Sequence, residues 1–308
     1  METGKQFKHL FYTPFSGLGA YGGHRGGRWL RNRISVFKQF VVPSLQKQVN
    51  PIVLWVSWRR EDRGDRQVEA LKAYLDTIKE FPTVFTYGGV CFWDDKYPDE
   101  IAHNRLAEAL HQSTHELINA LGDAETILMT IQPSDDLYAG DVSKIAQEIL
   151  SKDDIDAIGF TSGYIMNYTT GELGEYNPKT NPPFFTIKFP RATFLDPILH
   201  MEHTGPYKSH EYVGDKLRYL PIPIRKFLVG THGENISTHY NHPYKGRVIE
   251  GDEKKDILSY FAITNPTIHI PLSFRKWLMR KLPYRWQRKL RYIFGEKFFN
   301  KIYNLLRN

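Results

Sequence analysis

The sequence predicts an α/β fold in which a mixed, mostly parallel sheet is flanked by helices and followed by a basic helical tail. Short apolar runs of strand length alternate with stretches of helical spacing through the first half of the chain. The run at 52–58 is continuously apolar, which is typical of a strand buried on both faces. Repeated strand and helix units favour parallel strands with helices on both faces.

Each expected element has a local pattern. The apolar runs predict strands over residues 9–13, 52–58, 83–87 and 125–130. Helical spacing predicts helices over residues 29–48, 66–80, 101–121 and 140–150. The first of these helices is expected to break at Pro43, because proline lacks the N–H that an internal helical turn requires.

The pattern changes after Ile155. Short aromatic stretches at 177–183 and 184–189 predict β-hairpins and long loops, and residues 220–231 predict a strand that returns to the sheet. We therefore expect one domain over residues 1–271 and a separate tail over residues 272–308.

Composition places the chain among globular proteins of a reducing compartment. Of its 308 residues 41% are hydrophobic, and a single cysteine, Cys91, excludes an internal disulfide framework and a cysteine-rich zinc site. The N-terminus lacks the apolar stretch of a secretory signal, and no run reaches the roughly 18 apolar residues of a membrane-spanning helix. We expect a cytoplasmic protein.

The net charge of +7 is unevenly divided. Residues 272–308 contain 11 Lys or Arg and one acid, Glu296, whereas the rest of the chain contains 30 basic and 33 acidic residues. A slightly acidic body with a strongly cationic tail indicates an anionic surface as partner.

The tail has an amphipathic pattern. Ser273 could begin a helix that ends before Pro283, and a second helix from Tyr284 would carry one apolar stripe that includes Trp286, Leu290, Phe298, Ile302 and Leu305. Basic residues beside such a stripe favour a helix lying in a membrane interface. The alternative is a helix packed on the body with solvated lysines. We expect peripheral binding to the inner face of a membrane.

The strongest chemical feature is Ser134-Asp135-Asp136, directly after the strand at 125–130. Because hard cations prefer oxygen ligands, adjacent carboxylates at a strand's carboxyl end can hold Mn²⁺ or Mg²⁺ that bridges a diphosphate. A polar turn is the structural alternative.

A second feature follows the strand at 220–231, where His232, Gly233 and Asn235 occur together. A neutral imidazole is a good metal ligand, and glycine allows the backbone to approach a phosphate closely. A loop histidine capped by Asn235 or Ser237 is the alternative.

Two weaker candidates are also at expected loops. Arg59 and Asp62 follow the strand at 52–58, where the arginine could meet phosphate and the carboxylate a ribose or base, or where both could be solvated. Glu211 and Asp215 could deprotonate an acceptor hydroxyl, although acids at helix N-termini are common for structural reasons.

The order of these features resembles a known family. Residues 29–37 (WLRNRISVF) and 42–48 (VPSLQKQ) resemble the N-terminal signature of the rhamnosyltransferase family, whose members resemble GT-A glycosyltransferases. That family continues with a Trp-containing strand, an Asp-Asp motif and a late His-Gly-x-Asn-x-Ser motif, matched here by 54–56, 135–136 and 232–237. The resemblance covers residues 8–240.

One departure concerns the acidic motif. The family reads Arg-Leu-Asp-x-Asp-Asp, whereas this chain reads Ile131-Gln132-Pro133-Ser134-Asp135-Asp136, so that Pro133 replaces the first acid. Related enzymes use that acid to hold the ribose or the metal. The geometry of the nucleotide or the affinity for metal is therefore expected to differ.

The resemblance implies a GT-A-like, Rossmann-type domain that transfers a sugar from a nucleotide-sugar donor to a saccharide or lipid-linked saccharide in surface polysaccharide or glycan biosynthesis. By resemblance, Asp136 ligates Mn²⁺ or Mg²⁺ and His232 completes the coordination. Asp135 and its neighbour Ser134, together with Asn235, would contact the nucleotide, and Asp62 would lie near the base.

Two other classes of function remain open on sequence alone. A metal-dependent phosphohydrolase could use Asp135, Asp136, His232 and Asn235 to release phosphate without an acceptor. A nucleic-acid-binding protein could use the basic tail, but the bases there alternate with an apolar stripe and no known nucleic-acid module is visible. We expect no nucleic-acid partner.

Overall fold

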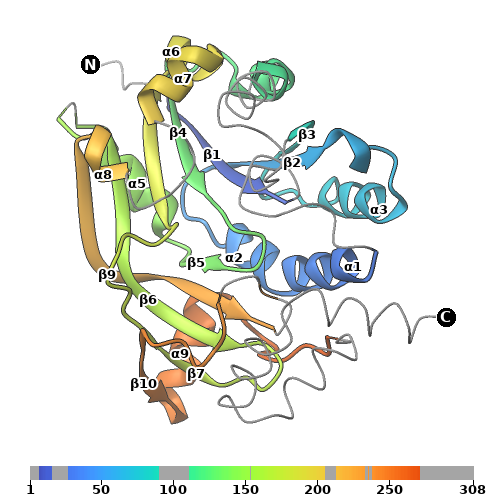
Figure 1. The fold of residues 1–308 in the computed structure, drawn as a ribbon, viewed down its shortest axis with the longest axis vertical. Helices are drawn as coiled ribbons and strands as arrows, with labels where there is room; N and C mark the ends of the chain where they lie inside the picture. The colour runs from blue at the N-terminus through green and yellow to red at the C-terminus, as the bar shows by residue number, and fades with distance from the viewer. Residues whose placement is uncertain are drawn as a thin grey trace, which may run out of the picture.

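The computed structural model of this 308-residue chain is an α/β fold with one mixed sheet flanked by helices (Figure 1), which confirms the expected fold class. It describes residues 7–15, 27–89, 111–152, 154–204, 213–232, 235 and 238–270. The basic tail lies outside these residues.

The first half of the sheet is parallel. Its strands are β1 (Phe7–Pro14), β2 (Val53–Arg59), β3 (Thr83–Gly89) and β4 (Thr126–Ile131), in the order β3-β2-β1-β4. Pro14 is paired with Ser57, and Tyr12 with Ile131, so the carboxyl ends of β1, β2 and β4 meet at one edge. The loops that follow these strands therefore lie beside one another.

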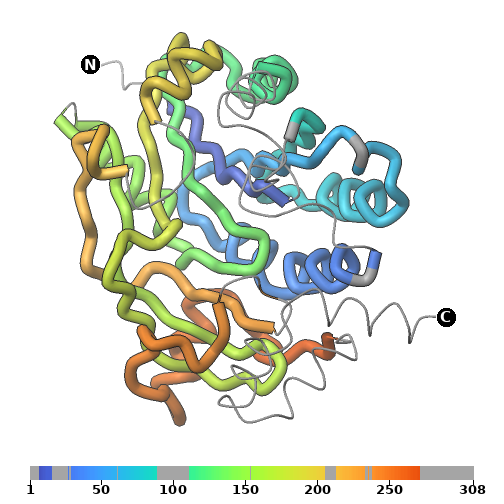
Figure 2. Tube along the Cα trace, in the orientation of Figure 1, coloured from blue at the N-terminus to red at the C-terminus, as the bar shows by residue number. Residues whose placement is uncertain are grey.

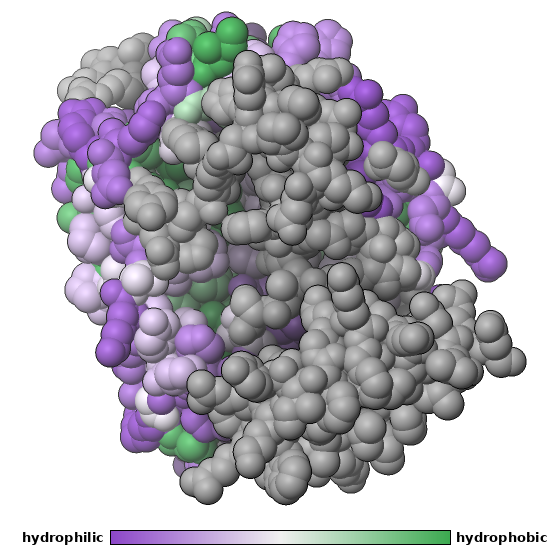
Figure 3. Space-filling view, viewed as in Figure 1, coloured by the Kyte–Doolittle hydropathy of each residue, from purple (hydrophilic) through white to green (hydrophobic). Residues whose placement is uncertain are grey.

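Helices cover both faces of this half, and apolar side chains gather in one cluster on each face. The first face carries α1 (Gly27–Val36), the π-helical turn η1 (Phe37–Val41), α2 (Val42–Gln46), α3 (Arg66–Leu75) and α5 (Val142–Leu150). The second carries a helix over 111–121, α6 (Arg191–Leu195), α7 (Pro197–Thr204) and α8 (Val213–Lys216). The outward side of α3 is hydrophilic, as Figure 3 shows.

Pro43 does not break the first helix, contrary to expectation. The chain stays helical to Gln46 because η1 precedes the proline and Val42 N donates to Phe37 O, five residues back. This wider turn places Pro43 at the start of α2, where a missing N–H costs little.

The second half of the sheet is largely antiparallel. Its strands are β5 (Leu137–Tyr138), β6 (Ala157–Asn167), β7 (Leu173–Tyr176), β8 (Phe185–Pro190), β9 (Tyr219–Thr231) and β10 (Lys245–Ile249), and α9 (Gly251–Tyr260) follows. The hairpin is β6–β7 rather than the expected 177–183, and 184–189 is not a hairpin. Instead, β8 is inserted between β4 and β6.

The long strand β9 returns to the sheet as expected, parallel to β6. Near its carboxyl end, Leu228 is paired with Leu137 of β5 and with Tyr164 of β6. Because β5 directly follows the turn after β4, this pairing brings the end of β9 beside that turn (Figure 2).

The first half of β9 forms an edge of the sheet. Up to Arg225 it is paired only with β6 among the described residues, and this part contains Pro221 and Pro223. Ile224 on the same segment is 41% exposed.

Within the described part of the chain, no helix combines the length and apolar character needed to cross a membrane. Exposed apolar side chains do occur on α7, where Ile198 and Leu199 are 64% and 44% exposed. Figure 3 shows a hydrophobic area at the top of the molecule, over α6 and α7.

A series of buried polar side chains connects the strands β1, β4 and β8 in the interior of the sheet. His9 Nε2 lies 2.7 Å from Thr130 Oγ1, which lies 2.6 Å from Thr186 Oγ1. His9 is 1% exposed, and burial lowers its pKa to about 3. The imidazole is therefore neutral in the folded protein at ordinary pH.

This burial predicts acid sensitivity. Below pH 6.5 the unfolded chain binds a proton at His9 that the folded chain does not bind until about pH 3, so stability falls as the pH drops through this window. The contribution is about 1.4 kcal/mol per pH unit at most. We expect His9→Gln to flatten the decline of the free energy of unfolding between pH 6.5 and 4.5, measured by urea denaturation.

The exposed His115 provides the control, since His115→Gln should leave the wild-type decline unchanged. If His9→Gln shows the wild-type slope, His9 is protonated in the folded state and the burial argument is wrong.

Candidate functional site

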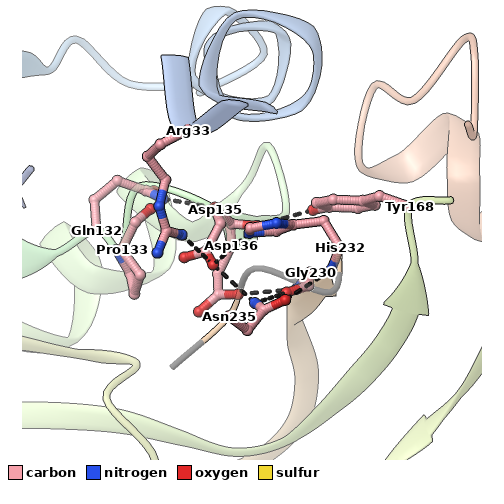
Figure 4. Close-up of polar contacts among 9 residues, drawn as sticks. All are labelled: Arg33, Gln132, Pro133, Asp135, Asp136, Tyr168, Gly230, His232 and Asn235. Carbon is pink, nitrogen blue, oxygen red and sulfur yellow. Dashed lines mark hydrogen bonds and ion pairs between the residues drawn. The ribbon is translucent and has the colours of Figure 1, made fainter. Parts of the chain in front are cut away.

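The site is built on the turn between β4 and β5, which carries Asp135 and Asp136. Gln132 N donates to Tyr12 O (2.8 Å) and extends the ladder of β1 and β4 by one residue. The Gln132 side chain then closes the turn, because its Nε2 donates to Pro133 O (2.8 Å) and Asp136 O (2.7 Å). This closure places both aspartates at the carboxyl edge of the sheet (Figure 4).

Asp135 is the hub of the site. One of its oxygens, Oδ2, accepts a hydrogen bond from Asn235 Nδ2 (2.9 Å), lies 3.3 Å from His232 Nε2 and forms an ion pair with Arg33. Figure 4 shows these three side chains reaching it from α1 and from the segment after β9. Burial alone would raise the pKa of Asp135, but Arg33 and His232 lower it to about 2.

Asp136 has a different environment. Its Oδ1 accepts a hydrogen bond from Gly230 N (2.8 Å). Burial and the neighbouring charge of Asp135 raise its pKa well above the usual range, despite the Gly230 hydrogen bond. The pKa values of the two adjacent carboxylates are thus shifted in opposite directions, because Asp135 is paired with a basic side chain whereas Asp136 accepts only a backbone N–H among the described residues.

An aromatic wall supports the turn from behind. Tyr168 OH donates to Asp135 O (3.1 Å), and the Tyr168 ring is stacked on Phe40 of η1 with ring centres 3.9 Å apart. Gly230 packs against this wall, since a Cβ there would lie 2.2 Å from Asp135 O and 2.3 Å from the Tyr168 ring. Only glycine allows β9 to approach the turn this closely.

Asn235 fixes His232 as well as Asp135. His232 N donates to Asn235 Oδ1 (2.7 Å), and Asn235 Nδ2 also donates to Gly230 O (2.7 Å). His232 is 1% exposed, and its ring is held against the Asp135 carboxylate. The sequence separation of about 100 residues between these groups is closed by the pairing of β9 with β5.

Four of the expected site residues therefore converge, namely Asp135, Asp136, His232 and Asn235. Ser134 is buried in the same turn.

Arg59 and Asp62 lie at the same edge but two strands away, after β2. They are paired with each other, with Arg59 Nη2 3.4 Å from Asp62 Oδ1, and Asp62 is 3% exposed. The segment after β2 is thus a locally ordered 3₁₀ turn rather than the solvated loop that was the alternative.

Asp215 is not brought to this site. It is exposed on α8, just before the first residue of β9, whereas His232 follows the last one. The 13 residues of β9 separate the two by roughly 40 Å along the strand. Asp215 therefore lies away from the turn that carries Asp135 and Asp136, because a residue before this strand lies at its opposite end. Glu211 lies outside the described residues.

Sequence reasoning missed Arg33, Gln132, Tyr168 and Gly230. Of these, Arg33 had a recognisable signal: it lies four residues after Trp29 and four before Phe37, both of which are buried. A cation on the apolar side of a helix needs an anionic partner in the interior. Tyr168 and Gly230 reach the site through tertiary packing, whereas the hydrogen bonds of the Gln132 side chain are local to the turn.

The donors at this site fit a divalent cation that also binds phosphate. Among the described residues no three His, Cys, Asp or Glu side chains gather into a metal-binding group. Magnesium sites, however, commonly use one or two carboxylates together with substrate phosphates. Asp136 and His232 offer that chemistry, and the buried Gln132 Oε1, which has no hydrogen-bond partner, adds an oxygen in the same turn.

Comparisons with known proteins give a likeness of fold only. No protein-family model matches the chain, and no curated protein matches it. Among solved structures, TarS 1–349 of S. aureus is 14% identical, with 91% of this chain and 77% of that chain covered and a TM-score of 0.38.

The complex of TarS 1–349 with UDP-GlcNAc is 12% identical over 92% of this chain and 77% of that chain, with a TM-score of 0.38. A 4-diphosphocytidyl-2C-methyl-D-erythritol synthase is 13% identical over 77% and 94%, with a TM-score of 0.34. Since all three TM-scores are below 0.5, the function proposed below rests on the residues of this chain.

Proposed function

We propose that this chain is a glycosyltransferase that takes a nucleotide sugar as donor and binds its diphosphate at the turn formed by residues 132–136. The convergence of Asp135, Asp136 and His232 at the carboxyl edge of parallel strands carries this proposal. A ligand in an open α/β sheet is bound at that edge.

Each side chain has a distinct task in the proposed reaction. Asp136 and His232 would hold Mn²⁺ or Mg²⁺, which when bound offsets the negative charge of the departing nucleoside diphosphate. Asn235 Oδ1 accepts from the backbone N–H of His232 and so holds the segment that carries the imidazole. Arg59 and Asp62, which are paired at the end of β2, would meet the phosphate and the ribose or base, respectively.

The acceptor half of the reaction is proposed from the resemblance. A saccharide or lipid-linked saccharide would be the acceptor. The family name suggests rhamnose as the sugar that is transferred. Surface polysaccharide or glycan biosynthesis would be the process served.

We also propose that the cationic tail binds the inner face of a membrane. Its 11 basic residues against one acid support electrostatic attraction to anionic lipids, worth about 1 kcal/mol per basic residue near the surface. The apolar stripe of the tail would then be buried in the interface. A cytoplasmic enzyme docked in this way would meet a lipid-linked acceptor.

The first prediction is that a nucleoside diphosphate and Mn²⁺ stabilise the protein together. A ligand at about 100 times its Kd raises the free energy of unfolding by about 2.7 kcal/mol. We expect UDP, GDP or dTDP with Mn²⁺ to raise the melting temperature, and Mn²⁺ alone to leave it unchanged. If no nucleotide acts with either Mn²⁺ or Mg²⁺, the donor site is not where we place it.

A sample with a nucleotide sugar in place of the nucleoside diphosphate distinguishes the transferase from the phosphohydrolase alternative. A hydrolase would release phosphate or nucleotide steadily from a nucleotide sugar without an acceptor, whereas a transferase should leave most of the donor intact. Steady release of nucleotide without an acceptor would favour the hydrolase.

The second prediction concerns individual ligands. Asp136→Asn and His232→Ala should each abolish the stabilisation by nucleotide with Mn²⁺ while far-UV circular dichroism stays unchanged. The exposed Asp123, at the opposite end of β4, and the exposed His115 provide matched controls. Asp123→Asn and His115→Ala should bind like wild type. Wild-type binding by His232→Ala would remove the histidine from the proposed site.

The third prediction tests the tail in the full-length protein. Replacing Arg285, Arg288, Lys289 and Arg291 together by Gln should weaken co-sedimentation with vesicles of phosphatidylserine and phosphatidylcholine. Binding of the wild type should fall but persist at high salt, since salt screens charge and leaves apolar burial intact. Equal binding by the two proteins would refute the membrane proposal.

A further inference from the structure

A buried arginine is the least expected component of the site. The Arg33 side chain is 2% exposed and that of its partner Asp135 is 7% exposed. Taking both charges out of water costs free energy that only close pairing repays. The Arg33 guanidinium also lies 5.3 Å from the centre of the Trp29 ring, on the same helix. The guanidinium is thus held by a carboxylate and by an aromatic ring.

The helix that carries Arg33 is itself anchored to the site. Phe40, one helical segment further on, is stacked on Tyr168, and Tyr168 OH donates to Asp135 O. Gln39 Nε2 donates to Thr267 O (2.8 Å) and Asn265 O (3.2 Å), which ties the same segment to the chain after α9. The distance between Arg33 and Asp135 is therefore fixed by packing on both sides.

The ion pair with Arg33 gives the carboxylates of Asp135 and Asp136 different surroundings. Asp135 Oδ2 contacts Arg33, Asn235 and His232, so an added cation would have to displace them. Among the described residues, the Asp136 carboxylate accepts a hydrogen bond only from the backbone N–H of Gly230. Pro133 occupies the position at which the resembling family has a further acid. Asp136 is therefore the one carboxylate of this turn that is not paired with a basic side chain among the described residues.

We propose that Arg33 is a positioning residue that holds Asp135 in a permanent ion pair and so reserves Asp136 as the single carboxylate ligand of the donor's divalent cation. This inference rests on the proposed function and deepens it. A cation with one carboxylate ligand depends on the phosphate oxygens for the rest of its coordination. Cation and nucleoside diphosphate therefore bind cooperatively, each increasing the affinity of the other by the same factor.

The test measures Mn²⁺ binding to the full-length protein without nucleotide, from the electron paramagnetic resonance signal of free Mn²⁺. Wild type should bind weakly. Arg33→Met frees Asp135 beside Asp136, and because partners of metal ligands change metal affinity by about 10- to 100-fold, we expect at least about tenfold tighter binding. Arg33→Lys retains the charge and should behave like wild type.

The double variant Arg33→Met with Asp135→Asn supplies the matched control. It lacks the released carboxylate, so the gain of Mn²⁺ affinity should disappear. If Arg33→Met binds Mn²⁺ no more tightly than wild type does, the positioning role is overturned. A purely structural arginine would lower stability and leave Mn²⁺ affinity unchanged.

Melting temperatures keep the proposal testable if Arg33→Met folds poorly. Removing one partner strands a buried charge, so Arg33→Met and Asp135→Asn should each melt lower than wild type, and the double variant higher than Arg33→Met. Additive losses would show that the pair is not coupled and would overturn the inference.

These measurements need no nucleotide, so they are separable from the donor hypothesis. Coupled melting and a gain of Mn²⁺ affinity, with no nucleotide binding by wild type, would refute the proposed function while the division of the carboxylates stands. Nucleotide binding without either effect would refute the role of Arg33 alone.

Discussion

The pairing of β9 with both β5 and β6 is the constraint on which the site depends. Leu228 lies in register with a residue of each neighbouring strand, Leu137 of β5 and Tyr164 of β6, so the end of β9 is fixed beside the turn that carries the aspartates. The glycine at position 230 allows this approach, since any Cβ would overlap Asp135 O. His232 and Asn235 then meet Asp135 as a consequence of backbone geometry rather than of side-chain reach.

Much of the first half of the fold could be predicted because its signals are local. The apolar run at 52–58 indicated a strand buried on both faces, and β2 is buried from Val53 to Trp58. The place of β8 between β4 and β6 could not be predicted, because antiparallel register there is set by partners more than 25 residues away in sequence. Helix 29–48 continued past Pro43 because a π-turn altered the hydrogen bonding that the proline would have broken.

The same division applies to the site. The motifs indicated that Asp136 and His232 would belong together. The local pattern around Arg33 indicates a buried cation, but which acid it meets depends on how α1 packs over the sheet edge. Asp215 illustrates the converse. Once residues 220–231 are taken as a strand that ends at the site, a residue before that strand has to lie at the other end. Strand direction thus places Asp215 away from the turn that carries the aspartates.

The two prolines of β9 have a consequence for association between molecules. Pro221 and Pro223 occupy the stretch of the strand that is paired with β6 alone among the described residues. A proline has no N–H to donate, so an incoming extended chain would find two gaps in the hydrogen-bond ladder within three residues. The apolar Ile224 beside them is therefore exposed on an edge that resists strand addition, which protects this sheet from edge-to-edge aggregation.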